Sequence, residues 1–160
     1  MAAEEIPLKH DRLLEHYQEA LRSRKSPFPY GDMIGFQLTE VEPGRAVIEL
    51  DCSDRHWNTV GTVHGGVHCS VADTAMGIAH GSLLGTGEIA TTVDLQIHFL
   101  RPMREGRMRA EAKVVKHGRT LSLVECDVRD SSGSLIARAS SQCMTLRPGE
   151  LENGKSGSAV

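Results

Sequence analysis

The hydrophobic pattern of the chain is dominated by residues 56–87, in which Asp73 is the single formally charged side chain. Apolar residues recur there at three- and four-residue spacing, which predicts a helix that starts after His64 and is apolar nearly all round. Such a helix is expected to be buried. Because an unpaired ionised carboxylate is costly to bury, we expect the fold either to supply partners for Asp73 or to favour its neutral form.

Alternation of apolar and polar residues predicts β-strands on both sides of this helix. Before it, residues 34–41 and 45–52 flank Glu42-Pro43-Gly44 and are expected to form a hairpin. Four longer strand patterns follow, over residues 93–100, 107–114, 121–129 and 135–146, and the first of these places Val93, Leu95, Ile97 and Phe99 on one face. The pattern predicts an α+β domain in which one central helix precedes most of an antiparallel sheet.

The two ends of the chain have patterns of their own. Residues 9–24 place Leu14, Tyr17 and Leu21 on one face, as in an amphipathic surface helix, and the proline-containing residues 26–31 break it. The last residues have the composition of a disordered tail. We therefore expect a helical N-terminal extension over residues 1–31, one domain over residues 32–147 and a disordered tail over residues 148–160.

Composition limits the classes of function. With 160 residues, 39% of them hydrophobic, the chain suits one globular domain. A net charge of −3 and 4% aromatic residues argue against nucleic acid as the main partner. We find neither a secretory signal nor a membrane span, so a cytoplasmic protein without a membrane partner is expected. The cysteines show no C-x-x-C spacing and are expected to be buried thiols: Cys52, Cys69, Cys126 and Cys143.

Candidate chemistry begins at His64-Gly65-Gly66, which opens the predicted helix. The first N–H groups of a helix lack partners within it, and the helix dipole adds partial positive charge, so a carbonyl oxygen lying there would be polarised. Together with the acid Asp73, these amides point to acyl chemistry. Two structural alternatives stay open. The glycines could serve only close packing or a tight turn, and the carboxylate could only bond a neighbouring loop.

The spacing of these groups predicts an oligomer. From Gly65 to Asp73 a helix advances roughly 12 Å at ~1.5 Å per residue, too far for both to contact one reacting carbonyl. If two copies pack as a symmetric dimer, the glycine end of one helix can face the aspartate of the other. We therefore expect a homodimer with two shared sites.

Metal binding is not expected. His64 and His68 are four residues apart, as zinc ligands on a helix can be. However, glycine follows His64 where a zinc protease has its glutamate.

Several motifs in one order resemble a known family. They are Asn58-Thr59-Val60-Gly61-Thr62-Val63-His64-Gly65-Gly66-Val67, Ala72-Asp73-Thr74-Ala75, Thr92-Val93-Asp94 and Phe99-Leu100-Arg101-Pro102. Over residues 34–147 the chain resembles the hotdog-fold acyl-CoA thioesterases, specifically the phenylacetate-pathway and 4-hydroxybenzoyl-CoA branch. The resemblance implies an antiparallel sheet wrapped around a long central helix, dimers joined edge to edge, and dimers that commonly pair into homotetramers.

The resemblance also implies roles for individual residues. Asp73 would act as nucleophile, or as general base on water, at the thioester carbonyl. The Gly65 N–H of the other subunit would polarise that carbonyl. Asn58 would position water or the helix end, and Thr92 would supply a small hydroxyl. His64 would order the loop or lie near the thioester sulfur.

The coenzyme A part of the substrate needs contacts for three phosphates, which arginine side chains suit. For Arg104, Arg107 and Arg109 a solvated strand face is expected instead. No separate cofactor is expected, because coenzyme A belongs to the substrate. By the resemblance, the coenzyme A contacts fall on Arg101, Arg119, Thr120 and Arg147.

One branch of the family carries glutamate where this chain has Asp73, and threonine where it has Gly77. Because the chain departs from that branch at these positions, the resemblance does not decide between an aryl and an aliphatic acyl group. Two other classes of function also fit. A hotdog dehydratase would use a histidine and acid pair, here His64 and Asp73, on acyl-carrier-protein substrates. A non-catalytic acyl-CoA sensor would bind the ligand and would usually carry an added DNA-binding segment. A Gly-Gly amide with an aspartate fits hydrolysis better.

Overall fold

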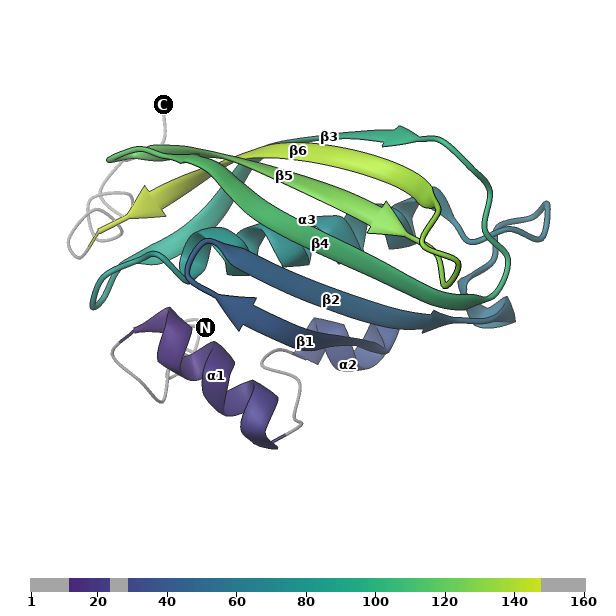
Figure 1. Cartoon of the computed structure of the whole chain (residues 1–160), viewed down its shortest axis with the longest axis horizontal. Helices are drawn as coiled ribbons and strands as arrows, with labels where there is room; N and C mark the ends of the chain where they lie inside the picture. Colours follow the sequence, from purple (N-terminus) through teal and green to yellow (C-terminus); the bar gives the residue numbers. More distant parts are fainter. Residues whose placement is uncertain (1–11, 24–28, 148–160) are drawn as a thin grey trace, which may run out of the picture.

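The computed structural model describes residues 12–23 and 29–147 of the chain. Six antiparallel strands form one sheet in the order β1-β2-β4-β5-β6-β3, which lies over a single long helix, α3 (Figure 1). The predicted α+β class and the antiparallel sheet around a central helix are confirmed. The elements are α1 (Leu13–Ser23), α2 (Pro29–Ile34), β1 (Phe36–Glu42), β2 (Arg45–Cys52), the short 3-10 helix Asp54–His56, α3 (Gly65–Gly81), β3 (Ile89–Phe99), β4 (Gly106–His117), β5 (Leu121–Arg129) and β6 (Leu135–Leu146).

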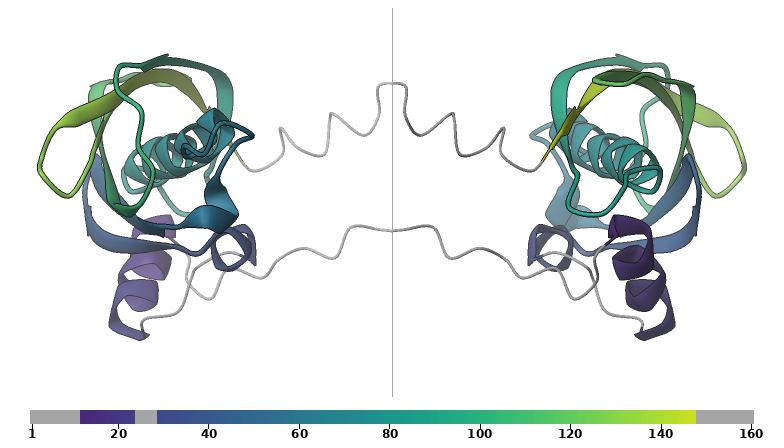
Figure 2. Two further views of the ribbon diagram at one scale, coloured as in Figure 1. Left: turned by 90° about the vertical axis from the view of Figure 1, so that its right-hand side faces the viewer. Right: turned by 90° about the vertical axis from the view of Figure 1, so that its left-hand side faces the viewer.

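Helix α3 begins at the predicted glycine pair and fills the concave side of the sheet. Its inner face carries Ala72, Ala75 and Ala79, all fully buried, so the sheet can approach the helix axis closely. End-on views show the sheet curving around the helix (Figure 2). Larger side chains complete the core, among them Ile48, Met76, Met108, Val124, Val128 and Ile136.

The hairpin of β1 and β2 closes at the predicted turn. Gly44 has a φ of +78°, a left-handed conformation that favours glycine, and Glu42 pairs with Arg45 across the turn. The Gly44 N–H also donates a 2.8 Å hydrogen bond to the hydroxyl of Ser82, the C-cap of α3. The hairpin is thereby joined to the far end of the helix.

The prediction that α3 is buried nearly all round is wrong for one face. Ser70, Asp73, Thr74 and Gly77 are partly exposed there. Helical spacing brings these four residues to one side, and the sheet does not close over that side. A single copy of the chain therefore leaves part of its central helix uncovered.

The alternation predicted for β3 holds only in its middle. Leu95 and Ile97 pack against the core, but Val93 is 53% exposed and Phe99 is 55% exposed. A bulge between Thr92 and Asp94 shifts the register against β6, which changes the face of the residues before it. Among the described strands, β3 pairs with β6 alone, so β3 is an edge of the sheet.

The N-terminal elements differ in part from their prediction. Helix α1 packs Leu13, Tyr17 and Ala20 inward, as an amphipathic helix does, while residues 9–11 and 24 lie outside the described residues. Where a break was predicted, Pro29–Ile34 form a helical turn and a half, because proline suits the first position of a helix. The predicted tail, residues 148–160, lies outside the described residues, and the predicted domain boundaries stay predictions.

The cysteines of the fold are thiols in or near the core. Cys52, Cys126 and Cys143 are buried as predicted, but the prediction is wrong for Cys69, which is partly exposed. Burial raises the pKa of Cys52 to about 11 and that of Cys126 to about 12, so both stay protonated near neutral pH. Among the described residues, no helix is long and apolar enough to cross a bilayer.

Candidate active site

The first turn of α3 leaves one backbone amide able to bind a ligand. His64 is the N-cap, and its Nδ1 accepts a 2.9 Å hydrogen bond from the Gly66 N–H. The Val67 N–H donates to the His64 carbonyl, also at 2.9 Å. The Gly65 N–H has no acceptor within the described part of the chain. It can therefore bind a carbonyl oxygen, while His64 orders the helix start.

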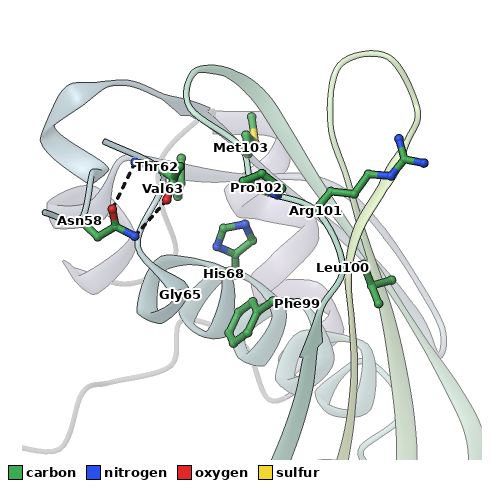
Figure 3. A pocket seen from close by; sticks show the side chains of 10 residues that line it. All are labelled: Asn58, Thr62, Val63, Gly65, His68, Phe99, Leu100, Arg101, Pro102 and Met103. Atoms are coloured by element: carbon green, nitrogen blue, oxygen red, sulfur yellow. Dashed lines mark hydrogen bonds between the residues drawn. The ribbon is translucent and has the colours of Figure 1, made fainter. Parts of the chain in front are cut away.

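A cavity of about 350 Å³ opens beside this amide. The loop before α3, the first turns of α3 and the segment that follows β3 line it (Figure 3). Its volume falls at the small end of the range for ligand sites. Apolar side chains form much of the wall, including Val63, Phe99, Leu100 and Met103.

Asn58 lines the same cavity and organises the loop that precedes the helix. Its Oδ1 accepts hydrogen bonds from the backbone N–H groups of Val60, at 3.0 Å, and Thr62, at 3.2 Å. Its Nδ2 donates to the Thr62 hydroxyl at 2.9 Å, as Figure 3 shows. Asn58 thus holds the loop that leads to Gly65, and its predicted role in positioning water or the helix end stays a prediction.

Asp73 lies on the open face of α3 and bonds the edge strand. The Thr92 hydroxyl donates a 2.9 Å hydrogen bond to Asp73 Oδ1, so the two residues that the resemblance selected are in contact. The carboxylate is thus hydrogen-bonded by this hydroxyl and is partly exposed to solvent. Asp73 is therefore neither fully buried nor bonded to a loop backbone among the described residues.

The candidate groups form two half-sites in one copy of the chain. Gly65, Asn58 and His64 gather at the start of α3, while Asp73 and Thr92 lie about two helical turns further on. Along the helix axis, Gly65 and Asp73 are separated by roughly 12 Å. Asp73 does not line the cavity beside the free amide. One reacting carbonyl cannot contact both within a single copy.

The residues predicted to hold coenzyme A also divide into two groups. Arg101 follows the end of β3, is exposed and lines the cavity. Arg119 and Thr120 form the turn between β4 and β5. The two groups lie at opposite ends of β6, since Phe99 pairs with Ala137 near the start of that strand and Thr120 accepts a 2.9 Å bond from Thr145 near its end.

Arg147 lies with the second group. Its guanidinium donates to the carbonyl of Arg119 and forms a 3.2 Å ion pair with Glu88. The side chains of Arg119 and Arg101 are exposed, as phosphate ligands should be. The structure therefore brings Arg119, Thr120 and Arg147 together and keeps them apart from Arg101.

Sequence reasoning considered His68 only as a zinc ligand and missed its place in the cavity. Its Nδ1 lies 3.2 Å from the carbonyl oxygen of His64, and its ring meets Phe99 edge to face, with 5.7 Å between centroids. Burial lowers the pKa of His68. Nothing in the spacing of the sequence could show this wall of the cavity, because Phe99 and Met103 come from a different part of the chain. Among the described residues, no three His, Cys, Asp or Glu side chains are grouped as a metal site would need.

A long helix enclosed by an antiparallel sheet is the arrangement expected of the hotdog-fold thioesterases. Residues 60–137 match the family model described as the thioesterase superfamily. Human acyl-coenzyme A thioesterase 13 is 31% identical over 105 residues, covering 63% of this chain and 73% of that protein. The chain belongs to the thioesterase superfamily, and its particular branch stays a prediction.

Two further similarities agree with this. The 1,4-dihydroxy-2-naphthoyl-CoA hydrolase of Listeria monocytogenes is 25% identical over 105 residues, covering 66% of this chain and 85% of that protein. A solved structure of a thioesterase family protein from Silicibacter pomeroyi superposes with a TM-score of 0.75 at 25% identity, covering 84% of this chain and 98% of that chain.

Proposed function

We propose that this protein is an acyl-CoA thioesterase, which hydrolyses an aryl- or medium-chain acyl-CoA to the free acid and coenzyme A. One observation carries the proposal. A free Gly65 amide opens the same helix on which Asp73 is held by the Thr92 hydroxyl. The human relative is named acyl-coenzyme A thioesterase 13 and the Listeria relative 1,4-dihydroxy-2-naphthoyl-CoA hydrolase, which supports this class of substrate.

The proposed reaction uses the amide and the carboxylate on one carbonyl. The thioester oxygen lies against the Gly65 N–H, which stabilises negative charge as it develops. Asp73 either attacks the carbonyl carbon, giving an anhydride that water then hydrolyses, or takes a proton from an attacking water. In both routes the C–S bond breaks, and coenzyme A leaves as the thiol. Thr92 holds Oδ1, and Oδ2, which has no partner among the described residues, is left for the reaction.

The amide and the carboxylate would come from two subunits. Three features support a homodimer: the separation of Gly65 from Asp73 along α3, the open face of that helix, and the unpaired edge of β3 with Val93 exposed on it. Antiparallel pairing of two β3 edges sets the two helices antiparallel, so that the start of each meets the middle of the other. We further propose that such dimers pair into homotetramers.

The same pairing would assemble the coenzyme A site. Ile89 begins β3 beside Leu146, and Phe99 ends it. In an antiparallel dimer, the Phe99 end of one strand meets the Ile89 end of the other. Arg101 of one subunit then approaches Arg119, Thr120 and Arg147 of the partner subunit, where several cations can bind the phosphates together.

Release of thiol, followed with a chromogenic disulfide reagent, tests the proposal. The substrates are phenylacetyl-, hydroxybenzoyl-, salicylyl- and straight-chain acyl-CoAs. Wild type is expected to hydrolyse some of them, and Asp73→Asn to lose most of that turnover while keeping its fold. Asp51→Asn is the matched control, because Asp51 is an exposed carboxylate on β2 that pairs with Arg107 away from the site.

Three outcomes would contradict the proposal. Unchanged turnover in Asp73→Asn would remove Asp73 from the chemistry. A hydrated enoyl product in place of free thiol would indicate a dehydratase that uses His64 with Asp73. Binding of acyl-CoA without any turnover would indicate a sensor. The cytoplasmic location expected from the sequence is part of the proposal, and four free thiols are consistent with a reducing compartment.

A further inference from the structure

His68 is a buried polar side chain to which the proposed chemistry gives no role. It is 4% exposed and lies three residues after Gly65, on the same side of α3. Figure 3 shows its imidazole between the helix start and the Pro102–Met103 segment, inside the cavity. The side chain is thus held against the cavity wall, and the hydrogen-bonding state of its two nitrogens decides what it offers to a ligand.

The bond at Nδ1 fixes the position of the ring proton. The carbonyl oxygen of His64, 3.2 Å away, can only accept, so Nδ1 must carry the proton that it donates. Burial lowers the pKa of His68 and outweighs the opposing effect of this bond, so the ring is neutral at pH 7. A neutral imidazole with its proton on Nδ1 presents a lone pair on Nε2.

Among the described residues the His68 ring makes one hydrogen bond, at Nδ1, and its Nε2 is not one of the fully buried polar atoms without a partner, so Nε2 is accessible from the cavity. Next to it, Phe99 stands edge to face, and Val63 and Met103 are apolar. The side-chain amide of Asn58, a neutral polar group of the cavity wall, is hydrogen-bonded within its own loop. Nε2 is therefore an uncharged acceptor on a largely apolar wall, one helical turn from the amide that would bind the thioester oxygen.

We infer that His68 selects the substrate by accepting a hydrogen bond at Nε2 from a hydroxyl group on the acyl part. The inference rests on the proposed thioesterase function and narrows its substrates to hydroxylated acyl groups. A hydroxyl group supplies a donor to Nε2 when the bound acyl group excludes water from the cavity. An unsubstituted acyl group leaves the lone pair without a partner, and an ether or carboxylate at the same place has no proton to give.

The experiment compares matched acyl-CoAs and two variants of His68. The substrates are benzoyl-CoA with its three hydroxy isomers and their methyl ethers, and hexanoyl-CoA with its 2- and 3-hydroxy derivatives. His68→Asn retains a donor near the position of Nδ1 but has no atom at Nε2, whereas His68→Gln places an amide near Nε2. His16→Gln on α1 is the control for loss of an imidazole outside the cavity.

Wild type is expected to favour one hydroxylated substrate over its unsubstituted and methylated partners by about tenfold in kcat/KM. His68→Asn is expected to lose this preference while still hydrolysing the unsubstituted substrate, and His68→Gln to keep part of it. If His68→Asn does not fold, the inference is still tested by comparing kcat/KM of the wild type for each hydroxylated substrate with that for its methyl ether. The preference in wild type supports the inference, and equal rates overturn it.

Failure of this inference can be told from failure of the proposed function. If wild type hydrolyses none of the substrates, the thioesterase proposal falls and this inference falls with it. If it hydrolyses them without regard to the hydroxyl, only the inference falls. If His68→Asn is folded and loses the same fraction of activity with every substrate, the inference also falls, because the lost contact would then not depend on the hydroxyl group.

Discussion

The Thr92 hydroxyl donates a 2.9 Å hydrogen bond to Oδ1 of Asp73 and thereby joins the middle of α3 to the edge strand β3. Thr92 is the last residue before the bulge in β3, where the register against β6 changes. The bond occupies one carboxylate oxygen, while Oδ2 has no hydrogen-bond partner among the described residues. The orientation of the candidate catalytic acid therefore depends on how the edge strand is placed.

Replacing Thr92 should lower the rate of hydrolysis more than the affinity for substrate. Thr92→Ala is expected to reduce kcat about tenfold, because the carboxylate loses the hydrogen bond that orients it, and Thr92→Ser is expected to restore most of the rate. Steady-state thiol release measures both. Thr39→Ala, on the opposite edge strand β1, is the matched control. Equal losses in the alanine and serine variants would contradict an orienting hydroxyl.

A methyl group at Gly65 should disable the amide that faces the carbonyl. A Cβ built there would lie 3.1 Å from Cζ of Phe99, so the ring or the helix start must move. Gly65→Ala is expected to lower kcat about a hundredfold, as loss of one oxyanion donor does in other enzymes. Gly77→Ala on the same helix is the control, because a Cβ there meets nothing within 4 Å in one copy of the chain. An active Gly65→Ala variant would move the oxyanion site elsewhere.

His80, in the last turn of α3, should make the fold sensitive to mild acid. It is fully buried, its Nδ1 has no partner among the described residues, and its ring centroid lies 5.8 Å from that of His117. Burial, and then the neighbouring His117, lower the pKa of His80, while the backbone of Met144 and then the charge of Glu88 oppose this in part. Below about pH 6.5 the unfolded chain therefore binds more protons than the folded chain.

The contribution of neutral His80 to the free energy of unfolding is therefore fully present above about pH 6.5. It is lost as the pH falls toward the pKa that His80 has in the folded chain. The midpoint of thermal unfolding, measured from pH 7.5 to pH 5, should fall more steeply for wild type than for His80→Leu, which cannot titrate. Some slope will remain in the variant, because burial also lowers the pKa of His68. His16→Leu on α1 is the control for loss of a histidine that is not in the core. Identical slopes would show that His80 is not the sensitive group.

The sequence could predict those features that depend on neighbouring residues. The hairpin turn follows from Gly44, and the start of α3 follows from His64-Gly65-Gly66, because these conformations are set within a few residues. Alternation in β5 and β6 also predicted their extents correctly. Motif resemblance selected Asp73 and Thr92 without showing that they are in contact.

Features that depend on distant parts of the chain could not be predicted. One face of α3 is open because the sheet does not extend over it, and the sequence of the helix alone does not show this. Helix α2 lies against this region, and the hydroxyl groups of Tyr30 and Ser70 are 2.7 Å apart across it. The His68 ring lies in an apolar wall because it contacts Phe99, which belongs to the end of β3, far from His68 in the sequence. Local spacing contains none of these contacts.

A shared site predicts that two inactive variants restore activity when they are mixed. In the proposed dimer, each site takes its amide from Gly65 of one subunit and its carboxylate from Asp73 of the other. A hybrid of Asp73→Asn with Gly65→Ala places both defects in one site and leaves the second site intact. Each such dimer should therefore recover about half the wild-type rate, although either parent alone is inactive.

Co-expression with two different affinity tags yields hybrids that can be verified before thiol release is measured. A hybrid of Asp73→Asn with wild type should show the same half rate, since one good site remains there too. Dimers that carry both substitutions in one subunit, paired with a wild-type subunit, distinguish the two models. In the shared arrangement those two substitutions damage both sites, and the dimer should be inactive. If the site lies within one subunit, the same dimer keeps half its activity, and the composite site would have to be abandoned.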